Sequence, residues 1–103
     1  MSVVLLNFAA PPDQQWDFIV AAFAIAESDE DLEHLAAGPV EHLLARHGPD
    51  FISKVEDHAS ADSRFCRMLT AVWQNAMTDD VWHRLRAIQL RVADPLAEYR
   101  SDA

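Results

Sequence analysis

The chain contains two glycines in 103 residues, and each stands directly before a proline, at Gly38-Pro39 and Gly48-Pro49. Glycine commonly follows the last turn of a helix, and proline suits the first turn of the next one. Each pair therefore predicts a helix end followed at once by a helix start. Since no stretch of the sequence has the alternating pattern of paired strands, these signals favour an all-α fold.

Further helix boundaries precede the two pairs. Pro11-Pro12 ends an N-terminal arm, and Asp13 is expected to cap a helix that runs to about residue 26. Ser28 or Asp29 is expected to cap a second, short helix that Gly38 ends.

Three stretches in the second half repeat apolar residues at the spacing of a helix face. They consist of Phe51, Ile52, Val55 and Ala59; of Phe65, Leu69, Val72, Trp73 and Ala76; and of Val81, Leu85, Ile88 and Val92. We expect Asp62 or Ser63 to cap the middle helix and Thr78 or Asp79 to cap the last one, which Pro95 interrupts.

The predicted architecture is a small irregular bundle. Short connections favour antiparallel neighbours, so we expect about five to six short helices of the helical-hairpin type. They form one domain over residues 13–100, between an apolar N-terminal arm (1–12) and a frayed C-terminus (101–103). Residues 2–8 of the arm are strand-like in composition, but a lone strand would need a partner chain.

The sequence argues against a membrane, secreted or cofactor-dependent protein. Residues 1–8 are apolar but lack the positive charge of a signal peptide, and the apolar run 18–26 is shorter than the roughly 20 residues of a membrane span. A single cysteine, Cys66, excludes an internal disulfide and a multi-cysteine zinc site. No phosphate-binding glycine loop occurs. We therefore expect a cytoplasmic protein with a reduced, buried thiol and no cofactor.

Charge is distributed unevenly along the chain. Its 17 acidic and 8 basic side chains give a formal net charge of −9. Residues 1–62 hold 12 acidic and 2 basic side chains, a net charge of −10, whereas residues 63–103 hold 5 and 6, a net charge of +1. This excess of acid disfavours nucleic acid and anionic membranes as partners.

The acidic half contains a candidate surface for a basic partner protein. One alternative is a solvated helix face, since acidic residues are favoured near helix N-termini. Another is that the arginines of the second half pair with these acids, within the chain or across a dimer. The residues assigned to the partner-binding surface are Glu27, Asp29, Glu30, Asp31 and Glu33.

The first predicted helix is apolar on nearly all sides. Such a helix lies at the centre of a core or is shared with a second molecule. Because a chain of this length has few helices with which to surround it, self-association is the second interpretation. The residues that would mediate a homodimer are Trp16, Phe18, Ile19, Ala22, Phe23 and Ile25.

Two Asp-x-x-His pairs raise the alternative of a metal site. Asp31 with His34, and Asp80 with His83, are spaced so that both side chains of each pair project from one face of a helix. Both aspartates also fall in an expected first helical turn, where capping and the helix dipole favour them without any metal. Adjacent acid and histidine residues elsewhere diverge around the helix, so no catalytic set is assigned.

The centre of the chain carries a family resemblance. It begins with Ala37-Gly38-Pro39-Val40-Glu41-His42-Leu43-Leu44-Ala45-Arg46-His47-Gly48 and continues with Phe51-Ile52, Glu56, Ala59, Asp62, Phe65 and Val72-Trp73. Over about residues 33–86 the chain resembles a family of small bacterial proteins known only as domain of unknown function 6869. The resemblance implies a compact helical domain, carries over no catalytic residue, and leaves residues 1–26 outside.

Three hypotheses follow from the sequence. The first is a non-enzymatic, acidic protein-interaction domain, of the kind found in immunity or inhibitor proteins, that binds a basic protein surface. The second is a small metal-dependent enzyme that uses the Asp/His pairs. The third is a purely structural homodimer.

Overall fold

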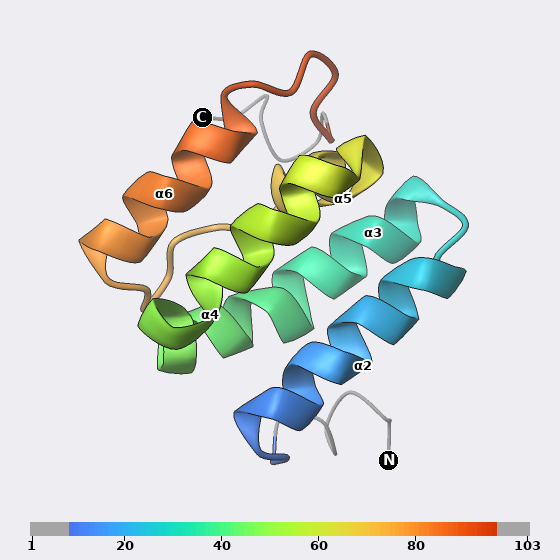
Figure 1. Cartoon of the computed structure of the whole chain (residues 1–103). Coiled ribbons are helices and arrows are strands. Elements are labelled where there is room, and N and C mark those ends of the chain that lie inside the picture. The colour runs from blue at the N-terminus through green and yellow to red at the C-terminus, as the bar shows by residue number, and fades with distance from the viewer. Residues whose placement is uncertain (1–8, 97–103) are drawn as a thin grey trace.

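The computed structural model describes residues 9–96, and every regular element among them is helical (Figure 1). The all-α class predicted from the sequence is therefore confirmed. Residues 1–8, which include the strand-like stretch 2–8, and residues 97–103, which include the predicted frayed end, lie outside the described residues. The elements are α2 (Pro12–Ile25), α3 (Asp29–Leu35), the π-helical turn η1 (Ala36–Val40), α4 (Glu41–Ala61), α5 (Ser63–Leu69) and α6 (Asp79–Gln89).

The two Gly-Pro pairs behave differently from each other. The predicted stop at Gly38-Pro39 is wrong, because both residues lie inside η1 and the chain stays helical from α3 into α4. A wider π-helical turn accommodates a proline that lacks an N–H group and would clash with the preceding turn of a regular helix. At the second pair the chain does break, at His47, whose φ of −137° and ψ of 23° are not helical. After this kink α4 runs back across the molecule (Figure 1).

The described residues thus form four helical runs, slightly fewer than the five to six short helices predicted. Helices α3, η1 and α4 follow one another without a gap, with a kink at His47 inside α4, and account for the difference.

Three predicted helix caps are confirmed. The Ser28 hydroxyl accepts a hydrogen bond from the Asp31 N–H at 3.1 Å, and Asp31 completes a capping box by accepting from the Ser28 N–H at 3.3 Å. Asp62 accepts from two N–H groups at the start of α5, and Thr78 accepts from one at the start of α6. Asp13 is not a cap: α2 begins with Pro11 in the cap position and Pro12 in the first turn, and no side chain bonds there.

The helix predicted through Ala76 ends early, at Leu69. Side chains from distant elements take the backbone groups that a longer helix would have used. Gln89 donates to the carbonyls of Leu69 and Val72 at 2.8 and 2.9 Å. Glu41 accepts from the Trp73 N–H at 2.9 Å. The segment from residue 70 to 78 is therefore a loop held by tertiary hydrogen bonds.

Helix α4 occupies the centre of the molecule, with α6 on one side and α2 and α3 on the other (Figure 1). A single core joins all of these elements. Its largest fully buried side chains include Phe65, Ile19, Leu43, Leu44, Ile52, Met68, Leu69, Leu85 and Leu96. Among the described helices, none is long and apolar enough to cross a membrane.

Gly48 allows α4 to approach α6 closely. A Cβ atom at this position would lie 2.9 and 3.0 Å from the two methyl groups of Val81, which is 2% exposed. We expect Gly48→Ala to destabilise the fold by about 1–3 kcal/mol, because a buried, β-branched valine has little freedom to move. The free energy of unfolding in urea measures this loss.

The Val81→Ala background is the control for that clash. Removing the valine methyl groups creates the space that the added methyl group needs, so Gly48→Ala should cost much less in Val81→Ala than in the wild type. An equal cost in both backgrounds would contradict the steric explanation.

Candidate functional site

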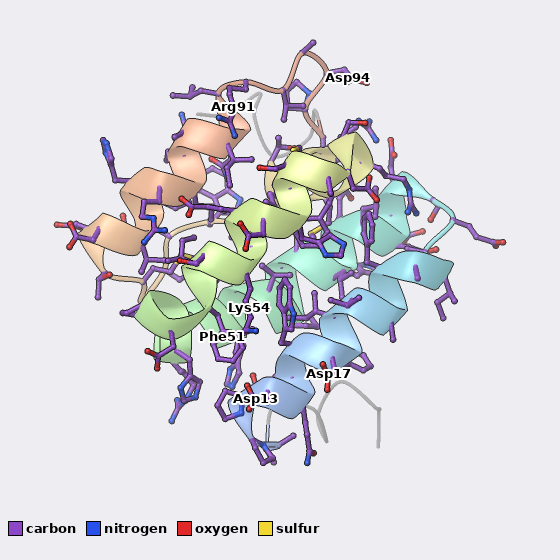
Figure 2. The ribbon with its side chains drawn as sticks, in the orientation of Figure 1. Asp13, Asp17, Phe51, Lys54, Arg91 and Asp94 are labelled. Atoms are coloured by element: carbon purple, nitrogen blue, oxygen red, sulfur yellow. The ribbon has the colours of Figure 1, made fainter. Side chains whose placement is uncertain are left out.

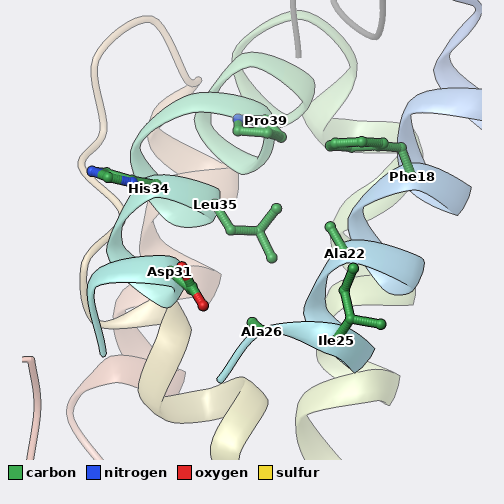
Figure 3. A pocket seen from close by; sticks show the side chains of 8 residues that line it. All are labelled: Phe18, Ala22, Ile25, Ala26, Asp31, His34, Leu35 and Pro39. Carbon is green, nitrogen blue, oxygen red and sulfur yellow. The ribbon is translucent and has the colours of Figure 1, made fainter. Parts of the chain in front are cut away.

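A shallow groove lies between the antiparallel helices α2 and α3, and we refer to it as the α2–α3 groove (Figure 3). It has a volume of about 290 Å³. This is at the lower end of the roughly 300–1,000 Å³ typical of small-molecule pockets, and the groove is open to solvent. The residues that line it are Phe18, Ala22, Ile25, Ala26, Asp31, His34, Leu35 and Pro39.

Helix α2 is apolar on two sides because it serves two surfaces. Ile19 and Phe23 are 0% and 4% exposed and belong to the core. Phe18, Ala22 and Ile25 follow a second stripe and line the groove, and Ile25 is 79% exposed. Of the residues assigned from sequence to a homodimer contact, Phe18 and Ala22 are half-buried against the core, and Ile25 alone is exposed.

Trp16 also packs within the chain. Its ring centroid lies 6.5, 6.1 and 6.3 Å from those of Phe51, His58 and Phe65, respectively. These rings come from α4 and α5, so the aromatic contacts fix the position of α2 on the bundle. The groove wall that α2 provides is therefore part of a packed helix.

Leu35 and Pro39 form the opposite side of the groove, and neither was assigned to a site from the sequence. Both are buried against the bundle, and Figure 3 shows them facing α2 across the gap. Their spacing of four residues places them on one face of a helix, but that pattern is equally typical of core. No signal in the sequence therefore indicated that this face borders a groove.

Helix α5 holds the turn between α2 and α3 through two arginines. Arg64 donates to the carbonyl groups of Phe23 and Ala26 at the end of α2, and its guanidinium lies 4.7 Å from the Phe23 ring centroid. Arg67 makes a two-pronged ion pair with Asp29, with N–O distances of 2.5 and 3.0 Å. The predicted pairing of second-half arginines with the acidic half is therefore present within the chain at Asp29.

The acidic residues of α2 and α3 differ in what they contact. Residues 12–35 contain seven carboxylates and no Lys or Arg. The ion pair with Arg67 holds the pKa of Asp29 below its usual range, and hydrogen bonds from the N–H groups of Glu27 and Ser28 do the same for the pKa of Asp31. Both aspartates are thus used to hold the fold.

Glu27 and Glu30 are the exposed carboxylates that remain at the α2–α3 turn. Within residues 9–96 neither makes an ion pair. Asp13 and Asp17 lie on the first half of α2, away from the turn (Figure 2). Glu33, the last residue of the predicted surface, is half-buried on α3.

The two Asp/His pairs do not combine into a metal site. Asp31 is engaged in the capping box, and the His34 ring points away from α2 (Figure 3). Asp80 and His83 are exposed on α6, which lies across α4 from α3 (Figure 1). The described part of the chain contains no group of three or more His, Cys, Asp or Glu side chains that could hold a metal ion.

A second polar feature, which was not assigned from the sequence, is the carboxylate of Glu41. It is 9% exposed and accepts hydrogen bonds from the Trp73 N–H and the Asn75 side chain. Asn75 has a φ of 46°, in the left-handed region that asparagine tolerates better than most residues. Burial raises the pKa of Glu41. Its position three residues before the buried Leu44, on the same helix face, was the available signal for burial.

Comparison with known proteins identifies a family. A model described as a family of unknown function, DUF6869, matches residues 1–93. The chain belongs to this family. No curated protein and no solved structure matched the chain.

The family match corrects the extent expected from the sequence. The expected limits of about 33–86 excluded the N-terminal helix, whereas DUF6869 covers α2, both walls of the groove and the residues that precede α2. In the stretch that carries the resemblance, Gly38 and Pro39 form part of η1 and Glu41 begins α4. These residues have structural roles: they shape the turn and anchor the 70–78 loop.

The raised pKa of Glu41 predicts a pH dependence of stability. Because the folded state binds the proton of the Glu41 carboxyl group more tightly than the unfolded chain does, protonation of Glu41 stabilises the fold. This stabilisation is complete below the ordinary carboxyl pKa of 4.5 and is lost as pH rises through the pKa of the folded state. The free energy of unfolding of the wild type minus that of Glu41→Gln should therefore fall as pH rises above 4.5. Urea denaturation at a series of increasing pH values measures this difference.

Glu56→Gln is the matched control. The ion pair with Arg84 lowers the pKa of Glu56, so the corresponding difference should rise with pH, with opposite slope. A flat or rising difference for Glu41→Gln would contradict the assignment of the buried carboxylate.

Proposed function

We propose that this protein is a non-enzymatic interaction domain that acts in the cytoplasm and binds a basic protein through the α2–α3 turn. The observation that carries the proposal is the pair of exposed carboxylates, Glu27 and Glu30, on a stretch without Lys or Arg. Charged groups of one sign attract a complementary surface and speed its encounter.

The way in which the turn is held supports this role. Arg64 bonds to the end of α2, Arg67 pairs with Asp29, and the capping box fixes the start of α3. Glu27 and Glu30 are therefore displayed on an ordered backbone. Binding through a preorganised surface loses less conformational entropy than binding through a flexible one.

A small acidic domain with such a surface suits an inhibitor of a basic protein, such as an immunity protein that neutralises a toxin. The structural homodimer has less support at this surface. A symmetric contact through the turn would place Glu27 and Glu30 of two copies close together, where like charges repel.

Affinity capture from an extract of the source cell tests the proposal, with the wild type and the charge-reversal variant Glu27→Lys/Glu30→Lys compared as baits. We expect captured partner to decrease at least about tenfold, and wild-type capture to fall as salt is raised, because the contact is electrostatic.

Asp57→Lys/Asp80→Lys is the control, since it changes the net charge equally. Asp80 lies in the first turn of α6 as Glu30 lies in the first turn of α3, so the local cost to helix stability is matched. Equal capture by the two double variants would refute binding through the α2–α3 turn.

A further inference from the structure

We infer that the α2–α3 groove receives an amphipathic helix whose apolar face enters the groove and whose other faces carry Lys and Arg. This inference rests on the proposed function and names the part of the partner that the surface binds. It concerns the apolar groove beside the turn, whereas the proposed function concerns the charges on the turn.

The shape of the groove fits a helix. Phe18, Ala22 and Ile25 project from α2 at spacings of four and three residues, and Leu35 and Pro39 repeat at four along α3 and η1. Two antiparallel helices with apolar stripes on either side of a groove provide the walls that a third helix needs. Docking of an amphipathic helix into such a groove, through residues spaced three and four apart, is a recurring mode of recognition.

The chemistry of the groove requires an apolar contact. Leu35 is 6% exposed at its base, whereas Ile25 is 79% exposed at its edge, more than the other large hydrophobic side chains described. Burial of such a side chain against an apolar partner is favourable in proportion to the apolar area removed from water. A volume of about 290 Å³ accommodates a few side chains of a neighbouring segment better than a whole cofactor.

Charge decides which helix can occupy the groove. The stretch that forms α2 and α3 has seven carboxylates and no Lys or Arg, although Arg67 of α5 pairs with Asp29 and Arg64 of α5 bonds to the end of α2. Glu27 and Glu30 stand at the end of the groove where α2 passes into α3. A second copy of α2 would bring further carboxylates to this surface, so the complementary occupant is a basic helix.

The test uses synthetic peptides of about 18 residues, long enough to form a helix in solution. One carries Leu at helical spacing among Lys residues, one has the same composition with Leu alternating, and one replaces Lys by Glu. We expect the helical Lys peptide to bind the full chain at least about tenfold more tightly than the other two, as measured by fluorescence anisotropy.

Ile25→Asp should weaken binding of the helical Lys peptide at least about tenfold, because the substitution places a carboxylate at the apolar edge of the groove. Leu90→Asp is the matched control, since Leu90 is also exposed, at 72%, but does not line the groove. Circular dichroism confirms that both variants fold. Equal binding of the helical and alternating Lys peptides, or unchanged binding by Ile25→Asp, would overturn the inference.

The two proposals fail in distinguishable ways. If Glu27→Lys/Glu30→Lys loses the cellular partner but Ile25→Asp retains the Lys peptide, the groove inference is wrong and the charged surface stands. If the charge reversal has no effect on partner or peptide, the proposed function is wrong. If light scattering shows a wild-type dimer that Ile25→Asp dissociates, the occupant is a second copy and the inference is overturned.

Discussion

The attachment of the α2–α3 turn to α5 is the interaction on which the candidate surface depends. The last carbonyl groups of a helix have no partner within the helix and are partly negative. At the end of α2 Arg64 donates to the carbonyl of Ala26 and to that of Phe23, which also accepts from the Ala26 N–H, and Arg67 binds Asp29 at the start of α3. Both arginines lie on one short helix that the core holds through Phe65 and Met68. The core thereby fixes the spacing between the walls of the groove.

The other side of the molecule depends on polar anchors of the same kind. Glu41, Thr70 and Gln89 are buried polar side chains, and each bonds to the backbone of a segment that has no regular structure. A buried loop must satisfy its N–H and C=O groups, and here side chains supply the partners that a helix would have provided. This arrangement explains why an apolar stripe at helical spacing, from Phe65 to Ala76, ends as a loop after Leu69.

Features that depend on a few neighbouring residues could be predicted from the sequence. The caps at Ser28, Asp62 and Thr78 act within three residues of themselves, and sequence identified each of them. The Gly-Pro pairs show the limit of such local signals. The same pair of residues, Gly-Pro, lies in a continuous π-helical turn at Gly38 but follows a kink at Gly48. At Gly48 the close contact with Val81 requires a residue without a side chain.

The candidate site could be predicted only in part, because local sequence signals do not reveal contacts between residues that are distant in the sequence. The acidic residues and the second apolar stripe of α2 are visible in the sequence. Which of these residues contact the rest of the fold and which remain exposed depends on residues that are distant in the sequence. Asp29 and Glu30 are adjacent and chemically alike, yet only Asp29 reaches Arg67, 38 residues further along the chain. From the sequence, Leu35 and Pro39 are expected to be ordinary core residues, and only the position of α2 in the structure shows that they line a groove.

This division of the acidic residues bears on how the surface would act. Carboxylates paired within the fold add little to the field that an approaching partner meets, so Glu27 and Glu30 contribute more to attraction than Asp29 does. Long-range attraction chiefly raises the rate of association, whereas apolar contacts that exclude water chiefly slow dissociation. In the proposed function the turn would supply the first and the groove beside it the second. Their adjacency on one rigid hairpin is the physical argument for treating them as a single binding surface.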